Sequence, residues 1–70
     1  MEQGTVKWYS ESRGIGIIVC DHGAREIAVT HFAIACDGFK MLYEGQRVRF
    51  EIVETAKGPA ASGVANEDEM

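Results

Sequence analysis

A chain of 70 residues, 46% of them hydrophobic and with a formal net charge of −4, predicts one small domain with a thin core. This charge argues against the broad basic surface that drives non-specific nucleic-acid binding, although a local group of cations remains compatible with it. No apolar run approaches the ~20 residues that span a bilayer, and no signal-peptide pattern is present, so we expect a cytoplasmic protein without a membrane partner.

The cysteines and histidines give no metal pattern. Cys20 and Cys36 are too few and too isolated for a disulfide framework, which favours reduced thiols. Together with His22 and His31 they match no zinc-ligand spacing, so we expect no metal and no cofactor. Paired carboxylates, a phosphate loop and a nucleophile signature are also missing from the sequence. We therefore expect no enzymatic activity and no catalytic residue.

Apolar residues alternate with period two along most of the chain, and Gly, Asp, Asn or Pro separate the runs. This pattern predicts five short strands, at 3–10, 15–20, 26–30, 47–54 and 59–65. Five short strands in one domain favour an all-β fold, a five-stranded antiparallel OB-type barrel. We expect the domain to span residues 1–66 and an acidic, solvated C-terminal tail to occupy 67–70.

The strand at 15–20 is apolar on both faces. Ile15 and Ile17 lie on one side of it, and Ile18 and Cys20 lie on the other. One side of the sheet of a small barrel normally faces water and is polar. An aliphatic outer face therefore indicates an altered binding surface or a contact with another chain.

The strand at 47–54 has one core face and one wet face, because apolar and charged residues alternate along it. The same alternation places other strand residues in the interior. In the connection from residue 33 to 45, Leu42 is expected to close the barrel end, and the rest reads as a loop. The expected core residues of the strands are Val6, Ile18, Ile27, Val29, Val48, Phe50, Ile52 and Val64.

Several segments together resemble the bacterial cold-shock proteins, without gaps from Gly4 to about Val64. They are residues 4–8, the glycines Gly14 and Gly16, and residues 33–34, 37–40, 44–46, 50–51 and 57–61. The resemblance implies a barrel that binds single-stranded RNA and DNA. It also implies stacking of bases on the rings of two ribonucleoprotein-like motifs, and action as an RNA chaperone or regulator.

The first of these motifs has lost its rings. In the family it reads Lys-Gly-Phe-Gly-Phe-Ile, and it falls here on residues 13–18. The cation and both glycines are kept, while Ile15 and Ile17 stand where the family has phenylalanine. Two stacking platforms are therefore missing.

The second motif reads Val-Phe-Val-His-Phe in the family and falls on residues 27–31, where ring positions hold Ala28, Thr30 and His31. Of these side chains, His31 can still stack on a base. In an alternative register, His31 and Phe32 match the His-Phe pair of the family. That register would turn both interior residues of the strand, Ile27 and Val29, to the outside.

The resemblance and the matching positions assign a nucleic-acid-binding role to one set of residues. Trp8 and Phe39 would supply rings for stacking, and the lysines and arginine would neutralise phosphates. Two alternatives stay open: Trp8 as a core residue, and Tyr9 as a partly buried ring with its hydroxyl in water. The full set is Lys7, Trp8, Tyr9, Ser10, Arg13, Ile15, Ile17, Ala28, Thr30, His31, Phe39, Lys40 and Lys57.

Two functions follow from these residues. Because each stacked base is worth ~1–3 kcal/mol, the missing rings predict weak binding of single-stranded RNA or DNA. Alternatively, the barrel serves as a protein-interaction module with little nucleic-acid binding. In that case Ile15, Ile17, Val19 and Ala28 would contact another chain, or a second copy would form a homodimer through this patch or by strand exchange.

Overall fold

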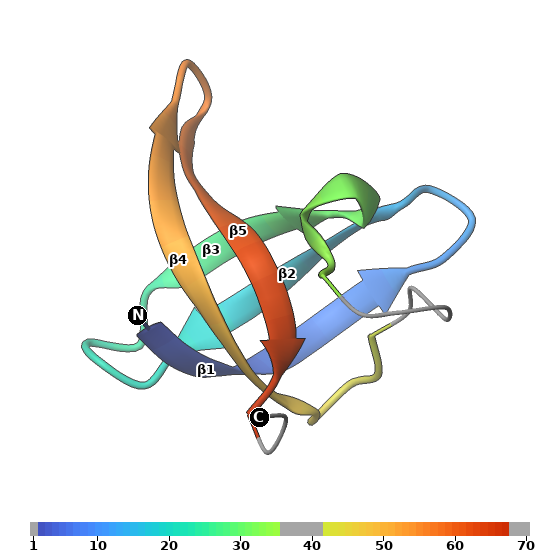
Figure 1. Cartoon of the computed structure of the whole chain (residues 1–70), viewed down its shortest axis with the longest axis horizontal. Helices are drawn as coiled ribbons and strands as arrows, with labels where there is room; N and C mark the ends of the chain where they lie inside the picture. The colour runs from blue at the N-terminus through green and yellow to red at the C-terminus, as the bar shows by residue number, and fades with distance from the viewer. Residues whose placement is uncertain (1, 36–41, 68–70) are drawn as a thin grey trace.

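Five strands form a closed barrel in the computed structural model, which describes residues 2–35 and 42–67. They are β1 (Glu2–Ser10), β2 (Ile15–Cys20), β3 (Glu26–Thr30), β4 (Arg47–Thr55) and β5 (Gly58–Asn66), and a short 3-10 turn, η1 (His31–Ala33), follows β3 (Figure 1). The predicted all-β barrel is confirmed, and every strand end lies within one residue of its predicted position.

The strands follow one another around the barrel in the order β1-β2-β3-β5-β4. Antiparallel pairs join β1 to β2 and β4, β2 to β3, and β4 to β5. A closed ring with an odd number of strands cannot alternate direction throughout. Accordingly, β3 and β5 run parallel where they meet at Ala28 and Ala60, and a parallel bridge between Ile34 and Val64 continues this seam.

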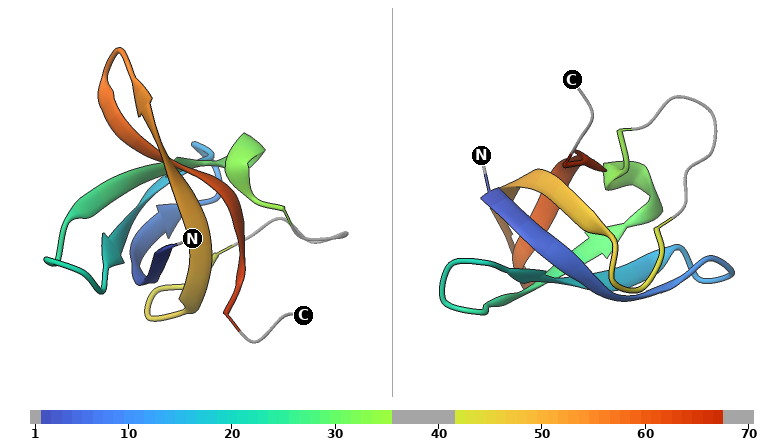
Figure 2. Two further views of the ribbon diagram at one scale, coloured as in Figure 1. Left: turned by 60° about the vertical axis from the view of Figure 1, so that its left-hand side comes forward. Right: turned by 90° about the horizontal axis from the view of Figure 1, so that it is seen from below.

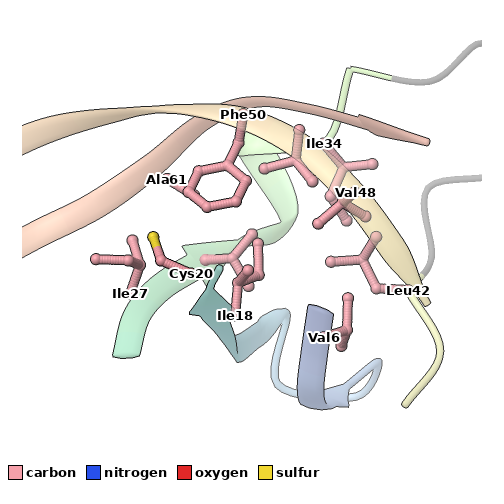
Figure 3. Close-up of a cluster of buried hydrophobic side chains, with 11 residues drawn as sticks. Val6, Ile18, Cys20, Ile27, Ile34, Leu42, Val48, Phe50 and Ala61 are labelled. Carbon is pink, nitrogen blue, oxygen red and sulfur yellow. The ribbon is translucent and has the colours of Figure 1, made fainter. Parts of the chain in front are cut away.

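The barrel interior is a single cluster of apolar side chains, and Figure 3 shows Phe50 pointing into it. The predicted core residues are buried except Ile52, which is only partly buried and packs against the cluster. The register of β4 against β5 shifts between Arg49 and Glu51. Past Ala60, where β5 meets β3, the two strands continue as a hairpin that projects from the barrel (Figure 1), and Ile52 lies on β4 near the base of that hairpin. Leu42 is 2% exposed, as expected of a residue that closes the barrel.

A cluster of charged side chains around Arg47 lies at one end of the barrel. Its guanidinium donates to both carboxylate oxygens of Asp21, at 2.7 and 2.6 Å, and to Glu67 at 2.8 Å. The hydrogen bonds from Arg47 lower the pKa of Asp21, and the two carboxylates raise the pKa of Arg47. Glu67, the first residue of the expected acidic tail, is thus held against β4, while residues 68–70 lie outside the described part of the chain.

The strands β4 and β5 cross over the sheet made by β1, β2 and β3 (Figures 1 and 2). The opposite side of that three-stranded sheet therefore faces away from the rest of the barrel. Within residues 2–35 and 42–67, no helix is long and apolar enough to cross a membrane.

Candidate nucleic-acid interface

We call the outward side of β1, β2 and β3 the strand face. It carries two rows of predicted site residues. Each row crosses the three strands through directly paired positions. Trp8 and Ile15 are each 40% exposed, and the β3 members of both rows are exposed. The first row is Trp8, Ile17 and Ala28, and the second row is Ser10, Ile15 and Thr30.

A β-bulge in β1 places Trp8 on this face. Val6 pairs with Ile18 and Trp8 pairs with Ile17, so Lys7 is the extra residue between two consecutive partners on β2. Strict alternation from Val6, which is 1% exposed, would turn Trp8 into the core. The bulge turns both Lys7 and Trp8 outward instead. The alternative reading of Trp8 as a core residue is therefore excluded.

Gly16 allows β1 and β2 to approach closely beside this bulge. A Cβ atom at Gly16 would lie 2.5 Å from the carbonyl oxygen of Trp8 and 2.8 Å from Cδ1 of Tyr9. Neither distance is compatible with a side chain, so the backbone that carries Trp8 needs glycine at this position.

The side chain of Tyr9 points toward the core, on the opposite side of the sheet from Trp8. It pairs with Gly16, which pairs with Val29, and its ring packs against the core cluster. Its hydroxyl is buried and has no hydrogen-bond partner among the described residues, so it is not in water. Burial raises the pKa of the Tyr9 phenol, and the nearby charge of Glu11 raises it further. Tyr9 thus lies behind the strand face and not on it.

We expect Tyr9→Phe to leave the free energy of unfolding unchanged or to raise it by about 1 kcal/mol. A buried hydroxyl without a partner costs ~1–3 kcal/mol of desolvation, and the substitution removes that cost while it keeps the ring. Urea unfolding followed by circular dichroism measures the change. Tyr9→Leu, which removes the ring as well, is the control and should destabilise the fold. A clear loss of stability in Tyr9→Phe would show that the hydroxyl makes a stabilising bond.

The predicted cations are only partly gathered at the strand face. Lys7 lies on it and donates to the carboxylate of Glu26 at 2.6 Å. Arg13 is exposed in the turn between β1 and β2, beside the second row. Lys57 lies in the turn between β4 and β5, and this hairpin projects away from the barrel (Figure 1). Phe39 and Lys40 fall outside the described residues, so their place in the site stays a prediction.

The register of the second motif is settled by burial. Ile27 and Val29 are 0% and 1% exposed, whereas Ala28 and Thr30 face outward. The alternative register, which would turn both interior residues outward, is wrong. Phe32 follows β3 and is 93% exposed.

Cys20 and the histidines form no metal centre in the described residues, where no three His, Cys, Asp or Glu side chains come together. Cys20 is buried in the core, and burial raises the pKa of its thiol. Cys36 lies outside the described residues. The exposed side chains of the strand face suit stacking, apolar contact and charge pairing.

Sequence reasoning missed two features of this surface. Glu26, the partner of Lys7, is 19 residues away in the chain, and only the pairing of the strands reveals the contact. The sequence points to Phe32 only through an alternative register, and its exposed ring beside the second row depends on the turn η1.

Comparison with known proteins identifies the family of this chain. The sequence model of a family described as "'Cold-shock' DNA-binding domain" matches residues 2–66. The chain belongs to the cold-shock domain family.

Among its relatives, the cold shock-like protein CspE of Escherichia coli (strain K12) is 50% identical over 62 residues, which cover 89% of this chain and 90% of the relative. Cold shock-like protein CspA of Stigmatella aurantiaca is 44% identical over 64 residues, 91% of this chain and 94% of the relative. A probable cold shock protein A of Mycolicibacterium smegmatis is 42% identical over 64 residues, 91% of this chain and 96% of the relative.

Proposed function

We propose that this protein binds single-stranded RNA or DNA across the strand face, as a cold-shock-like RNA chaperone or regulator of weakened affinity. The observation that carries the proposal is the exposed ring of Trp8, held outward by a bulge and followed across the sheet by Ile17 and Ala28. Membership of a family described as a DNA-binding domain supports the same class of ligand.

The strand face suits unpaired bases because it combines one large ring, apolar neighbours and adjacent cations. Bases that are not in a duplex expose both π faces, which stack on rings and pack on aliphatic side chains. Trp8 offers the ring, and Ile15 and Ile17 offer apolar contact. Lys7 and Arg13 flank these side chains and supply positive charge for phosphates.

Weakened affinity follows from the same residues. Aliphatic side chains at the ring positions pack on a base but provide no π-stacking, and Ala28 offers it almost no surface. At ~1–3 kcal/mol per stacked base, the loss of two to four platforms costs about 2–8 kcal/mol before aliphatic contacts restore part of it. At ~1.4 kcal/mol per tenfold change, the affinity falls at least about tenfold relative to a barrel with all its rings.

Trp8→Ala tests the proposal most simply. A labelled pyrimidine-rich oligonucleotide followed by fluorescence anisotropy should bind this variant about 5- to 150-fold more weakly than the natural protein. Val53→Ala truncates an exposed side chain on β4 and should bind unchanged. Equal affinities for the natural protein and Trp8→Ala would show that the strand face is not part of the binding site.

The ion pair between Lys7 and Glu26 opposes phosphate binding, because a phosphate must displace the carboxylate. The two side chains are 52% and 54% exposed, so the pair itself is weak. We expect Glu26→Gln to tighten binding at low salt by about 2- to 5-fold. Glu51→Gln, which changes the net charge equally on β4, is the control. If both variants tighten binding to the same extent, overall charge and not the Lys7 contact is responsible.

A second candidate function is self-association through the strand face. The exposed Ile15 and the neighbouring Ile17 and Ala28 form an aliphatic patch, and such patches often mark contacts between proteins. Size-exclusion chromatography with light scattering separates the two proposals. A monomer that binds the oligonucleotide supports the first, and a dimer that does not bind it supports the second.

A further inference from the structure

A shallow groove of about 500 Å³ adjoins the second row of the strand face. One wall consists of the turn from Glu11 to Gly14 and the first residue of β2, and the other wall spans Thr30 to Phe32. Because Ile15 and Thr30 belong both to the second row and to the groove, the groove continues the strand face past its last row. Phe32 is not among the residues to which the family resemblance assigns a binding role.

Backbone contacts fix the two walls relative to each other. The N–H of His31 donates to the carbonyl oxygen of Gly14 at 2.8 Å, and the N–H of Gly14 donates to the carbonyl oxygen of Ser10 at 2.8 Å. Gly14 has a φ of 67°, and a Cβ atom there would lie 3.3 Å from Cβ of His31. The groove is therefore formed before any ligand arrives, which reduces the entropy lost on binding.

Phe32 stands at the rim of this groove with 93% of its surface exposed. Its ring lies edge-on to that of His31, with the centroids 5.8 Å apart and an interplanar angle of 81°. This contact leaves most of the phenyl ring open to solvent. An accessible ring is what stacking on an unpaired base requires.

Charge and shape favour a nucleotide as the occupant. One wall of the groove holds both an apolar side chain, Ile15, and a cation, Arg13, which match the flat base and the anionic phosphate of one nucleotide. The carboxylate of Glu11 also lines the groove, and it can accept a hydrogen bond from an N–H group on the edge of the base. A purely apolar occupant would make no use of the charges on Arg13 and Glu11.

We infer that the groove binds one unpaired nucleobase stacked on Phe32, with the adjoining phosphate at Arg13. This inference rests on the proposed function, since the strand that crosses the second row is the one that enters the groove. It extends the binding site by one base, and it supplies a stacking ring from a position outside the two motifs that lost theirs.

Substitutions at Phe32 test the inference, and its exposure means that they leave the fold intact. In anisotropy titrations with a labelled single-stranded oligonucleotide, Phe32→Ala should bind about 5- to 150-fold more weakly than the natural protein. Phe32→Tyr, which keeps the ring, should bind within about twofold. Phe32→Leu keeps apolar surface without a π face and should fall between the two. Val53→Ala is the control for loss of an exposed apolar side chain elsewhere.

A tryptophan placed in the groove gives an independent signal. The chain has one tryptophan, so the double variant Trp8→Phe with Phe32→Trp reports from the groove alone. Adding the oligonucleotide should quench its fluorescence. In the natural protein and in Phe32→Ala, Trp8 reports from the first row at saturating oligonucleotide.

The outcomes separate this inference from the proposed function. If Phe32→Ala binds like the natural protein while Trp8 is still quenched, the groove is not a base site and the proposed function stands. If neither tryptophan position responds, both proposals fail. If light scattering shows a dimer that Phe32→Ala dissociates, with oligonucleotide affinity unchanged, a second copy of the chain covers the ring and the inference is overturned.

Discussion

The double substitution Ile15→Phe with Ile17→Phe should raise the affinity for a single-stranded oligonucleotide by at least about tenfold. Each stacked base is worth ~1–3 kcal/mol, and part of that is already supplied by the aliphatic side chains. Both positions face outward on β2, so the new rings do not enter the core. Ala28 beside Ile17, and Ser10 and Thr30 beside Ile15, are small enough to leave space for them.

Anisotropy titrations at one fixed salt concentration measure this gain, because phosphate contacts make affinity dependent on salt. Val53→Phe is the matched control, since it adds a ring to an exposed aliphatic position on β4, away from the strand face. A double variant that binds no more tightly than the control would mean that bases do not lie across β2.

Phe50→Ala should remove about 3–5 kcal/mol of stability, the usual cost of truncating a buried phenylalanine. Phe50 is 0% exposed, and it is first by volume among the fully buried side chains of the described residues. Its ring points into the cluster, near Ala61 (Figure 3), so its removal leaves a cavity that this small core cannot fill. At ~0.05–0.15 kcal/mol per residue, the loss is comparable to the whole stability of the domain.

Urea unfolding followed by circular dichroism measures the effect of Phe50→Ala. We expect the variant to be substantially unfolded at 25 °C, and Phe50→Leu, the control, to lose much less because it fills most of the same volume. A cost below about 1 kcal/mol for Phe50→Ala would contradict the packing described for the barrel interior.

The strands could be predicted closely because period-two alternation and turn residues are local signals. The alternation around Val48 and Phe50 marks β4, and Gly58 with Pro59 marks the start of β5. Ile52 shows the limit of the same rule. Its position in the alternation is correct, but it lies near the base of the projecting hairpin and is only partly buried, and no local signal records where the burial of a strand ends.

The strand face could be predicted only with the help of the family resemblance. Alternation alone places Trp8 on the same side as Val6, inside the barrel, and the bulge at Lys7 reverses that. The hydroxyl of Tyr9, the contact between Lys7 and Glu26, and the open ring of Phe32 all depend on how distant segments pair. Such features are set by how the strands pair in the folded barrel, which the residues of one strand do not reveal.

The central claim is that Trp8 lies in the path of a bound single strand. Titrating a pyrimidine-rich oligonucleotide into the natural protein at low salt, and following its intrinsic tryptophan fluorescence, tests this directly, because Trp8 is the only tryptophan in the chain. We predict saturable quenching that weakens as salt is added. Fluorescence that stays constant up to high micromolar oligonucleotide would contradict the claim.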